Sequence, residues 1–370
     1  MNIRVGIIGV GNIGSAHAGA IYGGMVKGME LGALCDISQK RREELFELYK
    51  DVPIYEDYIQ MLDSGRVDAV IIATPHYFHP KMAEQSIKRK IHTLTEKPIG
   101  VFTKGILPLW NLAKENGVLF AIMLNQRTNK LFKLAKELID GGRIGQISYS
   151  HYEVTNWYRT EEYYRSATWR GSWQGEGGGV LINQAPHNLD LWCWLCGMPK
   201  RLKALCREGA YHNIEVEDYA EIFAEYQGGA VGVFIASTGI ENGKNRLEIK
   251  GERGTIILEK GVLTLTEGEQ VSEYFDEEYN GHLNILENFA SSILTGEKLI
   301  SPAICGLDSL TVSNGAYLSS WKGEWVDLPL DEDEFLSYLE KKIEGGKKVS
   351  FEGQESAIAH EYLKRWSTSW

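Results

Sequence analysis

The sequence has few cysteines and no long apolar run. Five cysteines in 370 residues, an odd number in a long chain without a secretion signal, favour reduced thiols in a cytoplasmic protein. No apolar stretch approaches the roughly 20 residues that cross a bilayer. The N-terminal MNIRVGIIGVG has no basic region that leads into an apolar stretch and a cleavage site, so we interpret it as a strand and not as a signal peptide. We therefore expect a cytoplasmic protein that does not bind membranes.

Positive charge is also scarce. Lysine and arginine number 39 against 50 aspartates and glutamates, so the formal charge is −11. Nucleic-acid binding depends on clustered basic side chains that neutralise phosphates. The basic runs at 40–42 and 88–90 are short, and we interpret them as solvated helix faces. This balance argues against a nucleic-acid partner.

A metal centre is not expected either. Cys193 and Cys196 form a CxxC pair inside the apolar sequence DLWCWLCG. A structural zinc site needs a second pair of ligands, and the sequence offers no second cysteine pair. We interpret both residues as buried structural thiols.

The chain length and the apolar pattern predict two domains. Apolar runs at 3–11, 31–36, 68–74, 91–98 and 119–127 alternate with segments of helical character, which predicts a doubly wound parallel sheet over 1–124. The strand-like runs of the second domain, over 125–370, are joined by glycine-containing turns and predict a large, mostly antiparallel open sheet. They lie at 146–158, 219–226, 230–237, 245–251 and 255–268. The predicted fold class is α/β, with an N-terminal Rossmann domain.

The first apolar run ends in a glycine-rich turn. Gly9, Gly11 and Gly14 form GxGxxG between a predicted strand and a predicted helix, and Asp36 follows Gly14 by 22 residues at the end of the next run. Such turns hold the pyrophosphate of a dinucleotide, and an acid in this place accepts ribose hydroxyls. We expect NAD as the cofactor. Basic side chains at 40–42 leave NADP as the alternative.

Two further strand ends carry polar residues. Thr74, Pro75 and His76 follow one apolar run, and Glu96 and Lys97 follow the next. Ligands of open α/β sheets gather at the carboxyl ends of the strands. A lysine at such a strand end also requires a partner or a chemical role.

In the second half, Gly177–Gly179 leads into an apolar segment with Asn183, His187 and Asp190. Spacings of four and three place side chains on one face if the segment is helical. Pro186 offers an alternative, because proline favours the first turn and the helix would then begin only near residue 185.

These motifs resemble the Gfo/Idh/MocA oxidoreductases. The carriers are GVGNIG at 9–14, EKP at 96–98 and GGGVLINQAPHNLD at 177–190. The resemblance implies that Lys97 and His187 flank a substrate carbinol beside the nicotinamide, and that the Lys97–Pro98 peptide is cis. It also implies a homo-oligomer in which another subunit covers the open sheet. Many members carry aspartate where this chain has Asn183.

We assign catalytic roles accordingly. His187 is the candidate general base, because an imidazole beside a neutral Asn183 and a cationic Lys97 is biased toward its uncharged form. Lys97 would stabilise the substrate oxygen. Asn183 and Asp190 would orient the imidazole or bind sugar hydroxyls, and the glycines would let the helix start close to the cofactor.

The remaining candidates complete two sets. The cofactor set is Gly9, Gly11, Asn12, Ile13, Gly14, Asp36, Thr74, Pro75, His76, His79, Glu96, Lys97, Asn125, Trp169 and Arg170. The substrate set is Lys97, Trp157, Tyr158, Arg159, Tyr163, Asn183, His187 and His282. Tryptophans and tyrosines concentrated between 157 and 194 favour a sugar ring, with core packing as the alternative.

The resulting hypothesis is NAD-dependent oxidation of a secondary hydroxyl of a pyranose or glycoside. Carbon 3 is favoured only by the resemblance to sugar 3-dehydrogenases of the family. Alternatives are an inositol or cyclitol dehydrogenase, a redox-neutral NAD-dependent glycosidase, and a non-catalytic NAD-binding sensor. The expected assembly is a dimer, tetramer or hexamer.

Overall fold

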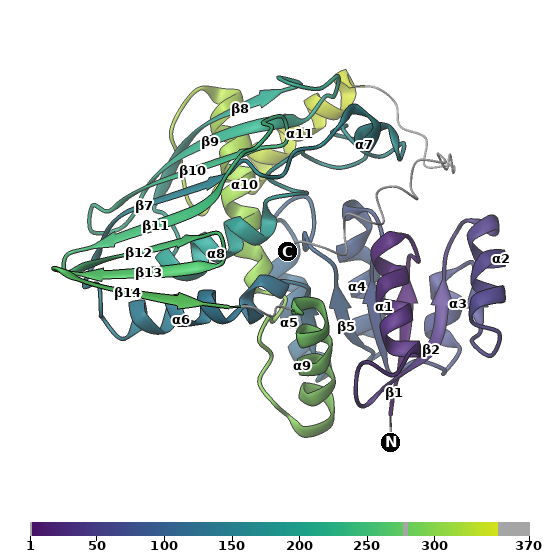
Figure 1. Ribbon diagram of the computed structural model, residues 1–370. Helices are drawn as coiled ribbons and strands as arrows, with labels where there is room; N and C mark the ends of the chain where they lie inside the picture. The colour runs from purple at the N-terminus through teal and green to yellow at the C-terminus, as the bar shows by residue number, and fades with distance from the viewer. Residues whose placement is uncertain (1, 277–279, 347–370) are drawn as a thin grey trace. The chain divides into compact units, whose positions relative to one another are not determined.

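The structure is a computed structural model that describes residues 2–276 and 280–346 (Figure 1). Within them the chain forms two compact units. The first comprises 2–100, 104–125 and 280–307, and the second comprises 101–103, 126–276 and 308–346. The predicted second domain extends to residue 370, so its last 24 residues lie outside the described residues.

The first unit contains a six-stranded parallel sheet. Its strands are β1 Ile3–Ile8, β2 Met29–Cys35, β3 Ile54–Tyr55, β4 Ala69–Ile72, β5 His92–Thr95 and β6 Phe120–Ile122. The strand order is β3-β2-β1-β4-β5-β6, and all five pairings are parallel. This order confirms the Rossmann prediction, and it reverses direction between β1 and β4, where such sheets bind ligands.

The helices of the first unit connect these strands. They are α1 Asn12–Tyr22, α2 Gln39–Leu48, α3 Tyr58–Asp63, α4 His79–Lys88, α5 Ile106–Asn116 and α9 Gly281–Thr295, with the 3-10 helix η1 His76–Phe78. Two of them begin at side-chain caps: Ser38 accepts from the N–H of Arg41, and Asp57 accepts from that of Ile59. Caps of this kind satisfy N–H groups that a helix start leaves open.

Helix α9 belongs to the first unit although it lies far along the chain. Ile285, Leu286 and Phe289 are at most 2% exposed, and they join the core that contains Val5 and Ile7 of β1. The predicted single boundary after residue 124 therefore differs from the observed grouping of 280–307. The apolar face of α9 finds its partner surface only in the three-dimensional structure.

The second unit contains a nine-stranded sheet. Its strands are β7 Ile147–Val154, β8 Arg201–Glu208, β9 Glu217–Glu225, β10 Val231–Ser237, β11 Asn245–Gly251, β12 Gly254–Glu259, β13 Val262–Glu267, β14 Gln270–Phe275 and β15 Val326–Asp327. The order is β14-β13-β12-β11-β7-β10-β9-β8-β15, and only the β7–β10 pair is parallel. The predicted mostly antiparallel sheet is confirmed.

Helices accompany this sheet. They are α6 Lys130–Asp140, α7 Glu161–Arg165, α8 Pro186–Cys196, α10 Cys305–Lys322 and α11 Glu332–Gly345, and the 3-10 helix η2 Asn125–Thr128 lies at the junction of the two ranges. On the inner face of the sheet, Trp192 of α8 packs against Phe234 of β10 with ring centroids 5.5 Å apart. Both side chains are fully buried.

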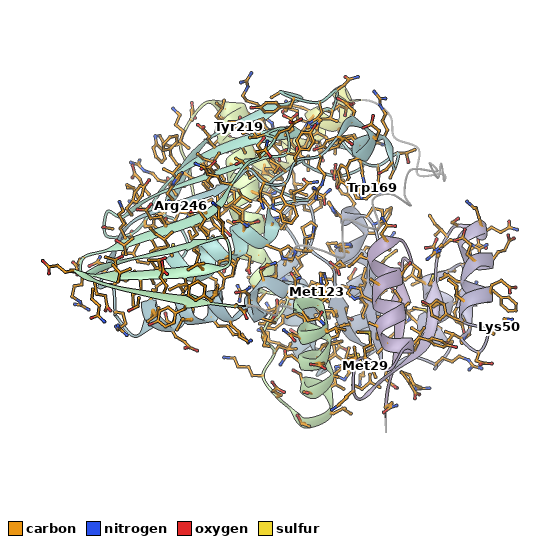
Figure 2. All side chains as sticks on the ribbon, viewed as in Figure 1. Met29, Lys50, Met123, Trp169, Tyr219 and Arg246 are labelled. Atoms are coloured by element: carbon orange, nitrogen blue, oxygen red, sulfur yellow. The ribbon has the colours of Figure 1, made fainter. Side chains whose placement is uncertain are left out.

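The outer face of the same sheet carries exposed apolar side chains. Leu205, Phe223 and Val231 are 52%, 51% and 46% exposed. Phe223 pairs across the sheet with Val233 of β10. Tyr219 and Arg246, which belong to the same face by alternation, are labelled in Figure 2. Across residues 2–276 and 280–346, no helix is both long enough and apolar enough to cross a membrane.

Candidate functional site

The glycine-rich turn between β1 and α1 depends on its glycines for two reasons. Gly9 has φ +85°, and a Cβ there would lie 2.8 Å from the Ala73 carbonyl oxygen. A Cβ on Gly14 would lie 2.0 Å from the Gly9 carbonyl oxygen. A Cβ on Gly11, in contrast, would meet no atom within 4 Å. The turn is therefore tight at its two ends and open at Gly11.

This open space lies at the start of helix α1. Gly11 is the N-cap residue, and it has no side chain to accept from the first-turn N–H groups of a helix that begins at Asn12 and Ile13. The free N–H groups of the first turn and the helix dipole favour binding of an anion at the N-terminus of α1. The turn thus fits the pyrophosphate of a dinucleotide.

Asp36 lies beside the same turn. Its Oδ2 accepts from the Val10 N–H at 2.8 Å, and its Oδ1 accepts from the Ser38 N–H at 2.9 Å. Each carboxylate oxygen has a further lone pair. Asp36 is consequently fixed in orientation and can still accept from ribose hydroxyls.

The basic run on α2 is bound to this turn. Arg41 donates from Nε to the Val10 carbonyl at 2.8 Å and from Nη2 to Ser15 Oγ at 2.5 Å. Arg42 donates from Nη1 to the Asp36 carbonyl at 3.1 Å. The interpretation of this run as a solvated helix face is therefore incorrect for both arginines, since Arg41 binds a carbonyl of the turn and Arg42 binds carbonyls that follow β2.

A buried histidine, His79, bridges the segments that follow β4 and β5. His79 is 1% exposed, and its ring nitrogens lie 2.7 Å from the Pro98 carbonyl and 2.6 Å from the Thr74 carbonyl. Burial lowers the pKa of this imidazole. With both nitrogens facing backbone, His79 supports the neighbouring loops rather than reaching a ligand, which differs from its predicted cofactor contact. His76, also predicted, is 5% exposed, and Pro75 directly precedes it.

Glu96 forms a buried ion pair that the sequence reasoning missed. Its Oε1 lies 2.7 Å from Nε2 of His17, and the two side chains are 8% and 2% exposed. Burial alone would raise the pKa of the Glu96 carboxyl, but the hydrogen bond and charge of His17, together with His282 and Lys97, lower it to about 2. The available signal was an imidazole on the otherwise apolar start of α1.

The pair extends to other predicted residues. Glu96 Oε2 accepts from the Lys97 N–H at 3.3 Å. His282 lies at the start of α9, its ring 5.9 Å from that of His17, and Asn125 Nδ2 lies 3.2 Å from His282 Nδ1. The Lys97–Pro98 peptide is cis, as expected. Lys97, Glu96, Asn125 and His282 therefore belong to one cluster.

In the second unit, helix α8 begins at Pro186, which supports the alternative raised by the proline. Asn183 therefore precedes the helix, and the prediction of one continuous helix face is wrong. The Asn183 N–H still bonds the Gly179 carbonyl at 2.9 Å, so this segment forms a single turn. Pro186 has no N–H to continue the ladder.

The glycines of this segment serve the second unit itself. A Cβ on Gly179 would lie 1.8 Å from the Glu217 carbonyl, and one on Gly175 would lie 2.2 Å from the Trp169 carbonyl. Packing within the second unit therefore requires these two glycines, and the expectation that the glycines make room for the cofactor stays a prediction. Backbone from two other segments occupies the space.

Glu217 anchors this loop from strand β9. Its carboxyl oxygens accept from the N–H groups of Gly179 and Leu181 at 2.8 and 2.9 Å and from the Tyr317 hydroxyl at 2.8 Å. The side chain is fully buried, and burial raises its pKa to about 8 despite these donors. The role of Glu217 was not predicted, because a single acidic residue at the start of a strand forms no recognisable sequence motif.

Asn183 lies at the centre of a buried polar network. Its Nδ2 donates to Glu176 Oε1 and, at 3.1 Å, to the Tyr163 hydroxyl. Arg170 donates to the same hydroxyl at 2.7 Å, and its guanidinium lies 4.5 Å from the Tyr163 ring centre. His187, in the first turn of α8, is 3% exposed. Among the predicted residues, Tyr163 therefore contacts both Asn183 and Arg170.

Asp190 has a structural role instead of the suggested contact with imidazole or sugar. Both of its oxygens accept from the Arg127 guanidinium, at 2.8 and 2.7 Å. Asp190 is 1% exposed. Burial raises the pKa of this carboxyl, although Arg127 opposes the shift.

The aromatic cluster divides into two groups. Trp173 and Trp192 are 2% and 0% exposed and belong to the core, which supports the packing alternative for them. Trp169 and Trp157 are partly exposed and contact arginines: the Arg170 guanidinium lies 4.4 Å from the Trp169 ring and that of Arg159 lies 5.4 Å from the Trp157 ring. Trp157 and Trp169, together with the exposed Tyr158, are accessible to a sugar.

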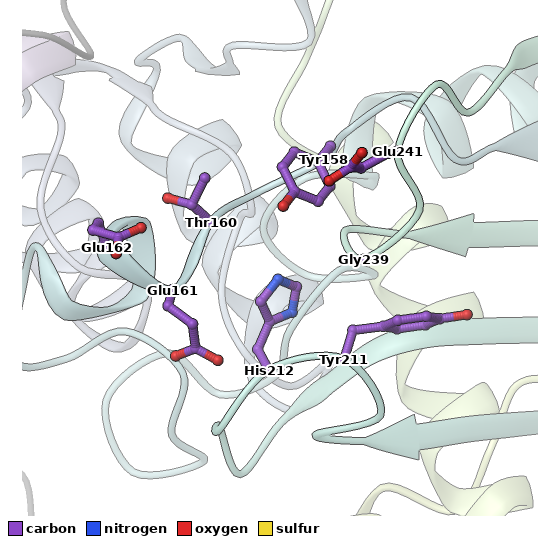
Figure 3. A pocket seen from close by; sticks show the side chains of 8 residues that line it. All are labelled: Tyr158, Thr160, Glu161, Glu162, Tyr211, His212, Gly239 and Glu241. Carbon is purple, nitrogen blue, oxygen red and sulfur yellow. The ribbon is translucent and has the colours of Figure 1, made fainter.

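A pocket of about 510 Å³ lies in the second unit next to α7 (Figure 3). Its lining is acidic and aromatic: Tyr158, Thr160, Glu161, Glu162, Tyr211, His212, Gly239 and Glu241. Burial alone would lower the pKa of His212, but its hydrogen bond with Asp218 raises it. Of the predicted substrate residues, Tyr158 lines this pocket.

The predicted site residues therefore form two groups. The first unit holds the glycine turn, Asp36 and the cluster of Lys97, while the second holds Asn183 and His187. Trp169 and Arg170, predicted to contact the cofactor, also belong to the second unit. The juxtaposition of Lys97 with His187 stays a prediction.

Comparison with known proteins identifies the class. Residues 3–124 match the model of the oxidoreductase family with an NAD-binding Rossmann fold, GFO_IDH_MocA, and residues 132–257 match the GFO/IDH/MocA C-terminal domain. The chain is an oxidoreductase with an NAD-binding Rossmann domain. It belongs to the Gfo/Idh/MocA family.

Relatives of known activity match most of its length. The myo-inositol 2-dehydrogenase of Thermotoga maritima is 25% identical over 324 residues, 83% of this chain and 92% of that protein. The WlbA dehydrogenase from Bordetella pertussis, solved with NADH and UDP-GlcNAcA, is 27% identical with a TM-score of 0.79, covering 90% of this chain and all of the other. Levoglucosan dehydrogenase, solved with NADH and levoglucosan, shares the fold at 20% identity, with a TM-score of 0.77 over 89% of this chain and 100% of the other.

Proposed function

We propose that this protein oxidises a secondary hydroxyl of a pyranose sugar or glycoside and transfers the hydride to NAD, with carbon 3 the favoured position. The observation that carries the proposal is the similarity along 90% of the chain to a dehydrogenase solved with both NADH and a sugar nucleotide. The buried polar network around Asn183 and the partly exposed Trp157 and Trp169 are suited to a polyhydroxylated ring. The preference for carbon 3 rests on the family resemblance of the sequence motifs.

Each candidate residue has a defined task. His187 takes the hydroxyl proton as the general base, and Lys97 stabilises the negative charge that develops on the oxygen. Asn183 orients the imidazole. NAD, held by the glycine turn and Asp36, supplies the hydride acceptor when bound.

A second candidate substrate is a cyclitol. It is favoured by the 25% identity with the myo-inositol 2-dehydrogenase of Thermotoga maritima. An inositol ring, like a pyranose, offers a secondary alcohol flanked by hydroxyls, so the same side chains would serve.

A substrate panel tests the proposal. The purified protein is incubated with NAD and with glucosides, free sugars, a UDP-sugar acid or myo-inositol, and NADH formation is followed by absorbance. Oxidation of pyranosides is the expected result, and oxidation of myo-inositol alone would select the cyclitol activity. Intact NAD binding without turnover of any compound would contradict the dehydrogenase proposal and favour a sensor or a redox-neutral enzyme.

Variants of the two proposed catalytic residues test their roles. Lys97→Met and His187→Ala are each expected to lower kcat/KM by about 10³-fold, because each removes a group that acts on the reacting oxygen. NAD affinity, measured by calorimetry, should stay near that of the wild type. Lys81→Met, an exposed lysine of α4, is the matched control. Loss of NAD binding in either variant would show that its role was misassigned.

We further propose that the outer sheet face binds a second copy of the chain. Leu205, Phe223 and Val231 form an exposed apolar surface on adjacent strands. Burial of such a surface against an identical one would stabilise a symmetric oligomer. Light scattering gives the native mass, and a monomeric mass at micromolar concentration would contradict this assignment.

A further inference from the structure

Glu176 is a buried carboxylate on which several donors converge. The residue is 1% exposed. Its Oε2 accepts from the Gly171 N–H at 2.7 Å, and its Oε1 accepts from Asn183 Nδ2. The Arg170 Nη1 lies 3.7 Å from the same Oε1. These donors compensate the cost of burying the negative charge.

This environment determines which way the Asn183 amide points. Asn183 Nδ2 donates both to Glu176 Oε1 and to the Tyr163 hydroxyl, so the NH₂ end of the amide faces Glu176. An ionised carboxylate favours this orientation, because it accepts hydrogen bonds and donates none. Rotation of the amide by half a turn would bring Oδ1 against Oε1, two acceptors in contact. Oδ1 is therefore directed away from Glu176.

The position of Asn183 in the chain gives this orientation a consequence. Asn183 precedes His187 by four residues, and Pro186 starts helix α8 between them. If Asn183 Oδ1 accepts an N–H from one nitrogen of the His187 imidazole, the other nitrogen is left unprotonated and able to act as a base.

We propose that Glu176 is a positioning residue for catalysis, which fixes the Asn183 amide so that its carbonyl oxygen is available to orient the His187 imidazole. The proposal rests on the proposed dehydrogenase function. In this proposal the carboxylate of the site belongs to Glu176, which accepts a hydrogen bond from the Asn183 amide. Position 183 itself carries no carboxylate.

An exchange of the two side chains tests this pairing. Asn183→Asp alone places two carboxylates in direct contact, where both cannot be ionised, and is expected to lower kcat/KM by about 10²-fold. Glu176→Gln alone removes the charge that selects the amide orientation and should lower kcat by about tenfold with little change in KM. The double variant Glu176→Gln/Asn183→Asp restores one carboxylate and one amide, and it should recover at least tenfold over Asn183→Asp.

The pH dependence separates positioning from general damage to the structure. In the double variant the carboxylate lies at position 183, so it should raise the pKa of His187 and move the acidic limb of the kcat/KM profile to higher pH than in the wild type. Glu340→Gln, an exposed glutamate of α11, is the matched control and should keep wild-type kinetics. A double variant no more active than Asn183→Asp, or Asn183→Asp with the wild-type rate and pH profile, would overturn the proposal.

Thermal melting distinguishes failure of this inference from failure of the proposed function. Asn183→Asp should melt at lower temperature at pH 8 than at pH 5, because protonation relieves the carboxylate pair, and the added Glu176→Gln should remove this difference. If the wild type oxidises no sugar or cyclitol, the dehydrogenase proposal fails. If the melting temperature of Asn183→Asp then depends on pH and the added Glu176→Gln removes this dependence, the contact between Glu176 and Asn183 is still supported. A melting temperature of Asn183→Asp that does not change between pH 5 and pH 8 would reject this contact as well.

Discussion

The two units each bury a carboxylate next to a proposed site, and the two carboxylates have opposite chemistry. Glu96 in the first unit faces the His17 imidazole, and its pKa falls to about 2. Glu217 in the second unit faces backbone N–H groups and the Tyr317 hydroxyl, and its pKa rises to about 8. Burial acts in the same direction on both. The difference arises because the His17 hydrogen bond and the nearby Lys97 favour the charged form of Glu96 more than burial disfavours it, whereas the donors around Glu217 do not outweigh its burial.

Glu96 and Glu217 therefore hold their neighbouring loops in different ways. Glu96 is a permanent anion next to Lys97, so it adds charge to the predicted catalytic end of β5. Glu217 is largely protonated at neutral pH, so it anchors the loop before Asn183 through hydrogen bonds with little charge. The second unit is thus able to position Asn183 without placing another anion beside Glu176.

Removal of the His17 imidazole should have the largest effect on this contrast. His17→Leu leaves the buried Glu96 without its partner and is expected to lower the free energy of unfolding by about 3–5 kcal/mol. Urea unfolding followed by fluorescence measures the loss. His17→Leu/Glu96→Gln should recover part of it, because no buried charge is left unpaired. A single variant as stable as the wild type would refute the ion pair as the source of the low pKa.

The pH dependence of stability should differ in sign between the two carboxyls. The pKa of Glu96 is lowered from 4.5, so its stabilisation is present above about pH 4.5 and is lost as the pH falls toward 2. The pKa of Glu217 is raised from 4.5, so its contribution is full below about pH 4.5 and is lost as the pH rises through 8. Melting temperatures measured between pH 3 and 9 should lose the acidic decrease in Glu96→Gln. They should lose the alkaline decrease in Glu217→Gln. Identical profiles in the two variants would contradict the assignment.

The smallest effect is expected at Tyr317. Tyr317→Phe removes one of three donors to Glu217 and should lower the free energy of unfolding by about 1 kcal/mol. It should also raise the pKa of Glu217 further, because a donor that favours the charged form is lost. Tyr338→Phe, on the partly exposed helix α11, controls for loss of a hydroxyl. Equal stability losses in both variants would argue against a specific role of the Tyr317 bond.

Sequence patterns predicted the elements whose signal is local. The GxGxxG turn, the five apolar runs of the first unit and the alternating strands of the second all lie where expected, because a turn requires glycine at fixed positions and a strand requires a two-residue period. Asp36 was found by its distance from the turn. The short β3 and the strands β8, β14 and β15 were missed, since they are brief or polar.

The tertiary structure alone decided which distant residues meet. His17 lies 79 residues from Glu96, and α9 joins a core built from the start of the chain. The sequence by itself determined that Asn183 and His187 are four residues apart. Only the folded chain brings Glu176 into hydrogen-bond contact with Asn183 and pairs Asp190 with Arg127. It also places the Glu217 carboxyl against the N–H groups of Gly179 and Leu181. Ion pairs and buried hydrogen bonds carry no sequence period, because they depend on separations in space and on the loss of water around each charge.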